Sequence, residues 1–491
     1  MRRTTPARTT LARTTLATGG VLLGLLAGGG AGDARAQSPP RTLQDALAAA
    51  YSNAPALQAA RAQLRATDEG VSQALSGWRP QVVIAGGVGY GDGTVRTSSR
   101  RTPGLPELTD QASASAVVGN ERNVFNAQAT LTQPLYRGGR TRADTNQADN
   151  RVFAQRGRLL ATEQQVLNDT VNAYVGVIQA QQLNELNQNN EQVLSRQLQA
   201  TNDRFRVGEI TRTDVAQAQA RLAGARSQVQ QSAGNLANAR ALYRRLVGEI
   251  PDRLVEPQPL RLPIRNPTEA AQLASQNNPN VIAALFDVAS ARDAIDVAFS
   301  QLMPQVSLQA SGARNDNATI AGQRIIGYQV LLNASVPLYQ GGAEYSRVRQ
   351  ARQQSQQTQR ALDDARRTAI AQATQAWETL TAARATADSA RSQIRANQIA
   401  LEGVQREALV GSRTTLDVLN AEQELLNSRV TLVQNLASLV TASYTVASAI
   451  GRLTARDLNL GVPLYDETAY YNAVRERLFG TGDYATSQPG R

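Results

Sequence analysis

Cysteine and histidine are both absent from the sequence. Without cysteine the chain has no disulfide, no thiol nucleophile and no cysteine for lipid attachment. Without histidine it lacks the most common general base and the most common metal ligand. A periplasmic hydrolase is therefore disfavoured, and no pair of carboxylates stands out as an alternative catalytic set. We predict a protein that is not an enzyme, with no catalytic residues, no metal site and no cofactor.

Lysine is also absent, so all 51 basic side chains are arginines, set against 40 acidic residues. The formal net charge is +11, but the arginines are spread among glutamines and aspartates along polar stretches. Aromatic residues make up only 4% of the chain, and none is interleaved with a basic block. This pattern is typical of solvated helix surfaces and argues against a nucleic-acid partner.

Long hydrophobic runs are missing except near the N-terminus, where Leu16 to Leu26 follows an arginine-containing start. This run is shorter than the ~20 residues of a spanning helix, and Ala34-Arg35-Ala36 fits a small-x-small cleavage site. We therefore predict a signal peptide over residues 1–36. Because no later segment has a spanning apolar run, a mature membrane protein would have to cross the bilayer by β-strands.

The chain contains the same pattern twice, in halves of about 200 residues that are far longer than a solenoid repeat. Pro134-Leu135-Tyr136-Arg137-Gly138-Gly139 recurs as Pro337-Leu338-Tyr339-Gln340-Gly341-Gly342, and Asn53-Ala54-Pro55 recurs as Asn277-Asn278-Pro279. The predicted domains are a first repeat at 37–248, a linker at 249–266, a second repeat at 267–451 and a partly disordered C-terminal extension at 452–491.

Each repeat opens with a predicted helix of about 35 residues, from Leu43 to Ser76 and from Thr268 to Ser300, which ends before a proline. Strands with period-two alternation follow, near residues 81–90, 125–132, 306–311 and 328–336. Such alternation suits a transmembrane strand with one lipid-facing side, and equally a half-buried soluble hairpin. We predict a long loop over Gly91 to Asn123 and a short one over Arg314 to Arg324.

Two long helices are predicted after the Gly-Gly pairs, over residues 140–206 and 343–409. At 1.5 Å per residue each would be roughly 100 Å long. Each is followed by a break at Val207-Gly208 or Val410-Gly411 and by a returning helix, near 212–247 and 415–450, which makes a helical hairpin. Alanine and glutamine dominate these segments, so we expect close packing in a thin wall rather than a thick core.

Four strands per chain cannot close a barrel, and an open sheet edge in hydrocarbon leaves unpaired backbone groups. Several chains must therefore contribute: two would give eight strands with a filled interior, and three would give twelve with a lumen.

The PLYxGG turns, the two tips, the start from Asn53 to Leu57 and the duplication together resemble the TolC family of outer-membrane efflux and type I secretion channels, over about residues 42–451. The resemblance implies a mainly α fold with transmembrane β-strands. It implies a homotrimer with a 12-stranded β-barrel in outer-membrane lipid, continued by a 12-helix periplasmic α-barrel. It also implies a periplasmic adaptor (membrane fusion) protein and an inner-membrane transporter of the RND or ABC type as partners. The cargo stays open: drugs, metals and polypeptides use the same duct shape.

Both tips carry Thr-x-x-Asp, ending at Asp214 and Asp417, which fits a capping box at the start of the returning helix. The resemblance adds a second role, because the family closes its periplasmic entrance with Arg–Asp links and rings of aspartate. It implies a periplasmic gate at Asp214, Arg413 and Asp417. Asn420 and Ala408 stand where the family can carry a second acidic ring and an aromatic link, so a looser closure is expected.

The tips are also expected to dock the adaptor, through Val207, Gly208, Val410 and Gly411. Gly138, Gly139, Gly341 and Gly342 are expected to form the strand-to-helix turns, because glycine readily adopts positive φ. The competing interpretation of the whole chain is a non-porous periplasmic coiled-coil structural protein. The doubled alternating strands argue against it.

Overall fold

The computed structural model describes residues 41–97, 116–119, 121–249, 254–318, 321–482 and 484. All described helices and strands belong to one unit, Pro39–Arg491. The predicted signal peptide lies outside the described residues, as do most of the predicted 91–123 loop and the end of the C-terminal extension.

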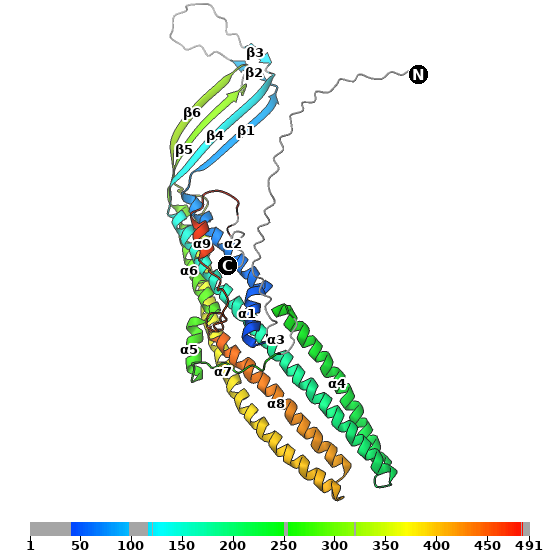
Figure 1. Cartoon of the computed structure of the whole chain (residues 1–491). Coiled ribbons are helices and arrows are strands. Elements are labelled where there is room, and N and C mark those ends of the chain that lie inside the picture. Colours follow the sequence, from blue (N-terminus) through cyan, green and yellow to red (C-terminus); the bar gives the residue numbers. More distant parts are fainter. Residues whose placement is uncertain are drawn as a thin grey trace, which may run out of the picture. The chain divides into compact units, whose positions relative to one another are not determined.

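One order of elements occurs twice: two short helices, a pair of long strands and a long helical hairpin (Figure 1). The first half contains α1 (Leu43–Asn53), α2 (Pro55–Leu75), β1 (Gln81–Gly91), β4 (Arg122–Arg137), α3 (Arg140–Arg206) and α4 (Arg212–Val247). The second contains α5 (Pro267–Asn277), α6 (Pro279–Phe299), β5 (Gln305–Asp316), β6 (Arg324–Ser335), α7 (Ala343–Leu409) and α8 (Thr415–Ala449).

The single opening helix predicted for each half was wrong, because each is two helices. Ala54 between α1 and α2 is extended, with φ −62° and ψ 120°, and Asn278 between α5 and α6 has φ −64° and ψ 126°. A proline follows each of them, and proline disfavours the helical conformation of the residue before it while fitting the first position of a new helix.

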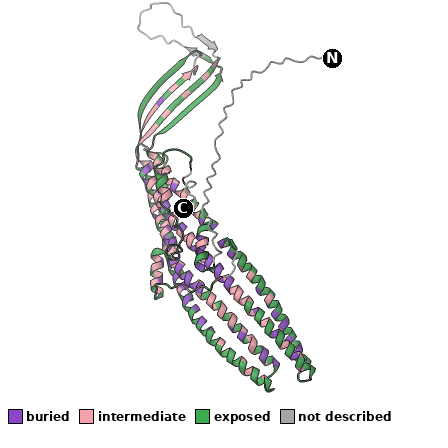
Figure 2. Ribbon diagram, viewed as in Figure 1, coloured by how far each residue is buried: buried purple, intermediate pink, exposed green. Residues whose placement is uncertain are grey.

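The four long strands form one antiparallel sheet in the order β1-β4-β5-β6. Its register places apolar side chains on one face, which we call the apolar face: Val82, Ile84, Val88, Phe125, Leu131, Ile326, Tyr328, Val330 and Leu332. The opposite face carries Gln128, Thr130, Gln309, Ser311, Gln329 and Asn333. The edge strands β1 and β6 are exposed along almost their whole length (Figure 2).

The segment expected to be a loop between β1 and β4 is not loop throughout. A short antiparallel ribbon of β2 (Thr94–Thr97) and β3 (Ala116–Gly119) lies within it. Valine and threonine in these short stretches favour strands, whereas the glycine- and serine-rich sequence around them is typical of a loop.

The two helical hairpins, α3–α4 and α7–α8, have the predicted lengths, with 67 residues in each long helix. Buried residues of α7 recur at alternating steps of four and three: Ala369, Ala373, Ala376, Leu380, Ala383, Ala387 and Ala390. This heptad spacing defines a coiled-coil seam, and the small alanine side chains let the paired helices approach closely.

Helix α8 departs from the expectation that no later segment could span a membrane. Its most apolar 18-residue window has a mean hydropathy of 1.2, enough by length and composition alone, and 33% of that window is buried. This helix has no unbroken apolar run, because its leucines and valines are mixed with serine, threonine and asparagine. The helix packs along α7 and α3.

The C-terminal segment packs back onto the first half. The short helix expected near Tyr470 to Leu478 is α9 (Ala469–Arg475), which contacts α2. Glu163 of α3 accepts a hydrogen bond from the Ala455 amide at 2.7 Å, and the Tyr470 hydroxyl donates to Glu69 at 2.8 Å. Residues 452–482 are therefore fastened to the helical part.

Candidate channel entrance at the hairpin tips

The first hairpin turns through a glycine cap followed by a threonine cap. Gly208 has φ +79°, and the Glu209 amide donates to the carbonyl of Arg204 at 3.0 Å, which closes α3 with a Schellman motif. Thr211 then opens α4. Its hydroxyl accepts from the Asp214 amide at 3.3 Å, while Asp214 accepts from the Thr211 amide at 2.9 Å.

The second hairpin repeats the same turn. Gly411 has φ +81°, and the Ser412 amide donates to the carbonyl of Glu407 at 3.0 Å. The Thr414 hydroxyl accepts from the Asp417 amide at 3.3 Å, and the Asp417 carboxylate accepts from the Thr414 amide at 3.0 Å. Both predicted capping boxes are therefore present.

These caps fix the charge of both tip aspartates. The Thr211 hydroxyl and amide lower the pKa of Asp214, and the Thr414 amide and hydroxyl lower that of Asp417. The two carboxylates consequently stay ionised at neutral pH. Each also lies in the first turn of its helix, where negative charge is favoured by the helix dipole.

Arg413 lies close to Asp417 but pairs with another residue. Its Nε lies 2.8 Å from Glu407 Oε2, at the end of the preceding helix α7. Between the described residues of a single chain, no hydrogen bond or ion pair joins Arg413 to Asp214 or Asp417. The three predicted gate residues are thus at the two tips, and one chain alone does not link them.

A contact between the two hairpins, which the sequence reasoning missed, lies beside the second tip. Arg221 of α4 donates from Nη2 to Asn420 Oδ1 of α8 at 3.0 Å. Below it Leu194, Leu222, Ala225 and Leu419 form a small buried cluster from three helices. Arg221 lies two helical turns after Asp214 in α4, and Asn420 lies nearly one turn after Asp417 in α8. Helical spacing therefore indicated that each of them is on the same side of its helix as the tip aspartate. The sequence did not show that α4 of one hairpin faces α8 of the other.

The residues expected to dock a partner are at the surface. Val207 is 77% exposed and Val410 is 80% exposed, each just before its tip glycine. Two exposed valines at matching positions give the tips a small apolar contact surface. The other predicted glycines are at the strand-to-helix turns, with φ between +62° and +81° for Gly138, Gly139, Gly341 and Gly342.

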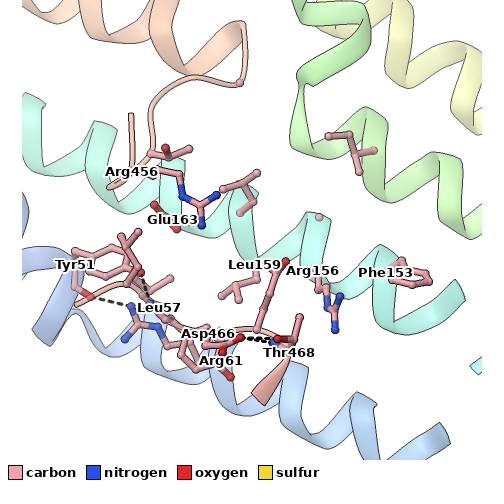
Figure 3. Close-up of a pocket in the computed structure, with 18 of the residues that line it drawn as sticks. Tyr51, Leu57, Arg61, Phe153, Arg156, Leu159, Glu163, Arg456, Asp466 and Thr468 are labelled. Carbon is pink, nitrogen blue, oxygen red and sulfur yellow. Dashed lines mark hydrogen bonds between the residues drawn. The ribbon is translucent and has the colours of Figure 1, made fainter. Parts of the chain in front are cut away.

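A cavity of about 820 Å³ lies elsewhere, between α1, α2, α3, α6 and the C-terminal segment (Figure 3). Arginines and carboxylates mix along its wall. Arg61 stacks on the Tyr51 ring at 4.7 Å and donates to the Tyr51 carbonyl at 3.3 Å, and Asp466 accepts from Thr468. Among the described residues no group of acidic side chains is arranged to hold a metal ion. Residues of the C-terminal segment, Asp466 and Thr468 among them, form part of this wall.

Fold and tips together define a class of protein: a duplicated chain in which each half joins a strand pair with one apolar face to a long helical hairpin. The chain belongs to the outer membrane efflux protein family, whose sequence profile matches residues 46–249 and 270–452. It is accordingly an outer-membrane protein with a large periplasmic helical portion. Members of this family are channel proteins rather than enzymes.

Known relatives match over nearly the whole chain. The outer membrane efflux protein BepC of Brucella suis is 35% identical over 445 residues, covering 89% of this chain and 91% of the relative. The outer membrane protein TolC of Vibrio cholerae is 26% identical, covering 83% and 90%. The solved CmeC outer membrane channel of Campylobacter jejuni superposes with a TM-score of 0.73 at 16% identity, covering 88% and 89%, and so supports the fold.

Proposed function

We propose that three copies of this chain form a passive exit duct of a tripartite efflux or type I secretion system. The observation that carries the proposal is the four-stranded sheet with one apolar face and two unpaired edges. An open edge in hydrocarbon costs several kcal/mol for each unpaired backbone group, so the sheet needs partners of its own kind. Twelve strands from three chains leave a lumen, lined by the face that carries Gln128, Thr130 and Gln309.

The hairpins of three chains would then continue the duct as a tube of twelve helices, with α3, α4, α7 and α8 contributed by each chain. The alanine seam of α7 supports this arrangement, because it lets neighbouring helices pack as a thin wall. The duct itself performs no chemistry. Energy would come from an inner-membrane transporter of the RND or ABC type, joined through a periplasmic adaptor protein that docks on the exposed tip valines, Val207 and Val410.

The periplasmic gate is assigned to Asp214, Arg413 and Asp417. Within one chain Arg413 pairs with Glu407, and its guanidinium group remains partly exposed at the tip. In a trimer we propose that Arg413 reaches Asp214 of the neighbouring chain, and that three Asp417 carboxylates ring the entrance and favour cations. Arg221 and Asn420 tie the hairpins of one chain together, so each chain's hairpins would move jointly or break this bond on opening.

The proposal is tested by single-channel conductance of the purified mature protein in a planar bilayer. The wild type should give a small, cation-preferring conductance. Arg413→Ser should raise it several-fold, because the guanidinium that bridges the tips is removed while the lumen is unchanged. Arg366→Ser, at an exposed arginine of α7 far from the tip, is the matched control and should behave as the wild type.

One result would overturn the duct, and another would overturn only its gate. If neither protein conducts despite correct folding, the non-porous coiled-coil structural protein becomes the better interpretation. If the wild type conducts but Arg413→Ser leaves conductance unchanged, the pore stands and the gate assignment is wrong.

A further inference from the structure

Three charged residues interrupt the apolar face of the sheet at its loop end. They are Arg314 and Asp316 of β5 and Arg324 of β6, and we call them the rim cluster. Asp316 is paired across the strands with Arg324 on one side and with Phe125 of β4 on the other. Arg314 lies two residues before Asp316, so all four side chains share one face. That face is the one carrying Ile326 and Tyr328.

The cluster is held in a fixed geometry. Arg314 Nη2 donates to Asp316 Oδ2 at 2.7 Å, Arg324 Nε donates to Asp316 Oδ1 at 2.9 Å, and the Arg314 guanidinium lies 5.6 Å from the Phe125 ring centre. Asn317, with φ +53°, closes the strand end: its side-chain amide donates to the Asn123 carbonyl at 2.9 Å and its Oδ1 accepts from the Gly322 amide at 2.7 Å. Both guanidinium groups are thereby kept beside one carboxylate.

The cluster retains a net positive charge and donors to spare. Two arginines share one aspartate, and Arg324 uses only Nε in its hydrogen bond to Asp316. Its side chain is 62% exposed and that of Arg314 is 47% exposed, whereas that of Asp316 is 17% exposed. The carboxylate is therefore recessed, and the guanidinium nitrogens are what a ligand would meet.

The position of the cluster identifies the environment it faces. The helical portion of the chain is periplasmic, and it joins the ends of β1, β4, β5 and β6 opposite to Asp316 and Arg324. The rim cluster therefore lies toward the outer surface of the membrane. A charge in the hydrocarbon core is costly, whereas arginine beside aromatic rings is stable at the level of the headgroups. Phe125, whose ring centre lies 5.6 Å from the Arg314 guanidinium, provides such a ring.

We propose that the rim cluster binds a phosphate group on the headgroup of an outer-leaflet lipid. Guanidinium groups recognise phosphate through paired, charge-assisted hydrogen bonds, and two of them beside a recessed aspartate present a preformed site. The acyl chains of the same lipid would cover Ile326, Tyr328 and Val330. The inference rests on the proposed function in one respect, namely that the apolar face is turned to lipid.

The test measures lipid binding to the purified mature protein in detergent by native mass spectrometry. Diphosphorylated lipid A is the probe, and the same lipid with its phosphates removed is the comparison. The wild type should bind the phosphorylated form at least about tenfold more tightly, as expected when charge-assisted hydrogen bonds are lost. Arg314→Gln and Arg324→Gln should each remove most of that preference, and Arg366→Gln on α7 should preserve it.

The outcomes separate this inference from the duct. Equal binding of the two lipids by the wild type, or an undiminished preference in both rim variants, would overturn the phosphate site. Single-channel recordings of the same preparations report on the duct independently. Conductance without a preference for the phosphorylated lipid would support the duct and overturn the lipid site. A preference for the phosphorylated lipid without conductance would support the lipid site and overturn the duct.

Discussion

The carboxyl group of Asp68, in α2, is buried in surroundings that disfavour its charged form. The residue is 1% exposed, and neither carboxylate oxygen has a hydrogen-bond partner among the described residues. Burial above all, together with the nearby Glu69 and Glu467 and against the opposing effect of Arg156, raises its pKa from 3.8 to about 7. The folded chain therefore holds a proton there that the unfolded chain releases at lower pH.

This burial predicts a pH dependence of stability. Since the pKa of Asp68 is raised in the folded state, folding takes up a proton between about pH 4 and pH 7, and the free energy of unfolding falls as the pH rises through that window. Asp68→Asn should stabilise the protein at pH 8 by on the order of 2 kcal/mol and have little effect at pH 4. Urea unfolding at both pH values measures this.

The matched control for Asp68 is Asp364→Asn, at an exposed position of α7. It should leave the unfolding midpoint unchanged at both pH values. A residual slope is expected in Asp68→Asn, because burial also raises the pKa of Glu163. Equal midpoints for wild type and Asp68→Asn at pH 8 would show that the carboxyl group is better solvated than its burial indicates.

At the scale of elements, the turn from β4 to α3 offers a matched pair of neighbouring glycines. Gly138 has φ +62°, and a Cβ there would lie 2.6 Å from the Ser300 carbonyl oxygen and 2.5 Å from Met303 Cβ. Gly139 has φ +81° with open space around it. Gly139→Ala should cost about 1 kcal/mol from backbone strain alone, and Gly138→Ala about 3 kcal/mol because the overlap adds to it.

Thermal unfolding of the two variants beside the wild type measures the difference. The order of their stabilities is the decisive result, because both substitutions add one methyl group at a left-handed position. If Gly139→Ala proved the more damaging, the packing of the 3₁₀ turn Ser300–Leu302 against this connection would not be what makes Gly138 necessary.

The long elements could be predicted from the sequence because local rules determine them. The bounds of α3 and α7 were predicted to the residue, since a positive-φ glycine pair precedes each and a Val-Gly cap follows. The break in each opening helix was not predicted, because the apolar periodicity continues across it. Pro55 and Pro279 are nevertheless local signs of the break. Faces of the strands followed from period-two alternation, but the pairing of β4 with β5 is a long-range contact that no local pattern contains.

At the tips too, local motifs could be predicted from the sequence, whereas contacts that depend on the folded arrangement could not. Capping boxes at Thr211 and Thr414 are local motifs and were predicted from four residues each. The pairing of Arg413 with Glu407 was not predicted, because it depends on how the Gly411 turn folds the chain back on α7. The bond from Arg221 to Asn420 joins two hairpins, so only their arrangement in space reveals it.

At the scale of the whole molecule, the sheet is built so that copies can close it. Its order β1-β4-β5-β6 is antiparallel throughout, so β6 runs opposite to β1. The β6 edge of one chain can therefore continue antiparallel pairing with the β1 edge of the next, and this repeats until the ring closes. A head-to-tail interface of this kind gives a closed ring only at one number of copies.

The absence of cysteine makes the number of copies directly measurable by cross-linking. Ile84→Cys places a thiol on β1 and Tyr328→Cys places one on β6 at the same level of the sheet, because Ile84, Ala129, Gly312 and Tyr328 are successive partners across it. A flexible bis-maleimide applied to the double variant in native outer membranes should give covalent dimers and trimers. Either single variant, whose thiols lie on one edge only, should stay largely monomeric.

A ladder that stops at three chains supports closure as a trimer, because a heterologous edge contact that did not close would continue to longer products. Products that end at two chains would instead require a barrel of eight strands with a filled interior, which conducts nothing.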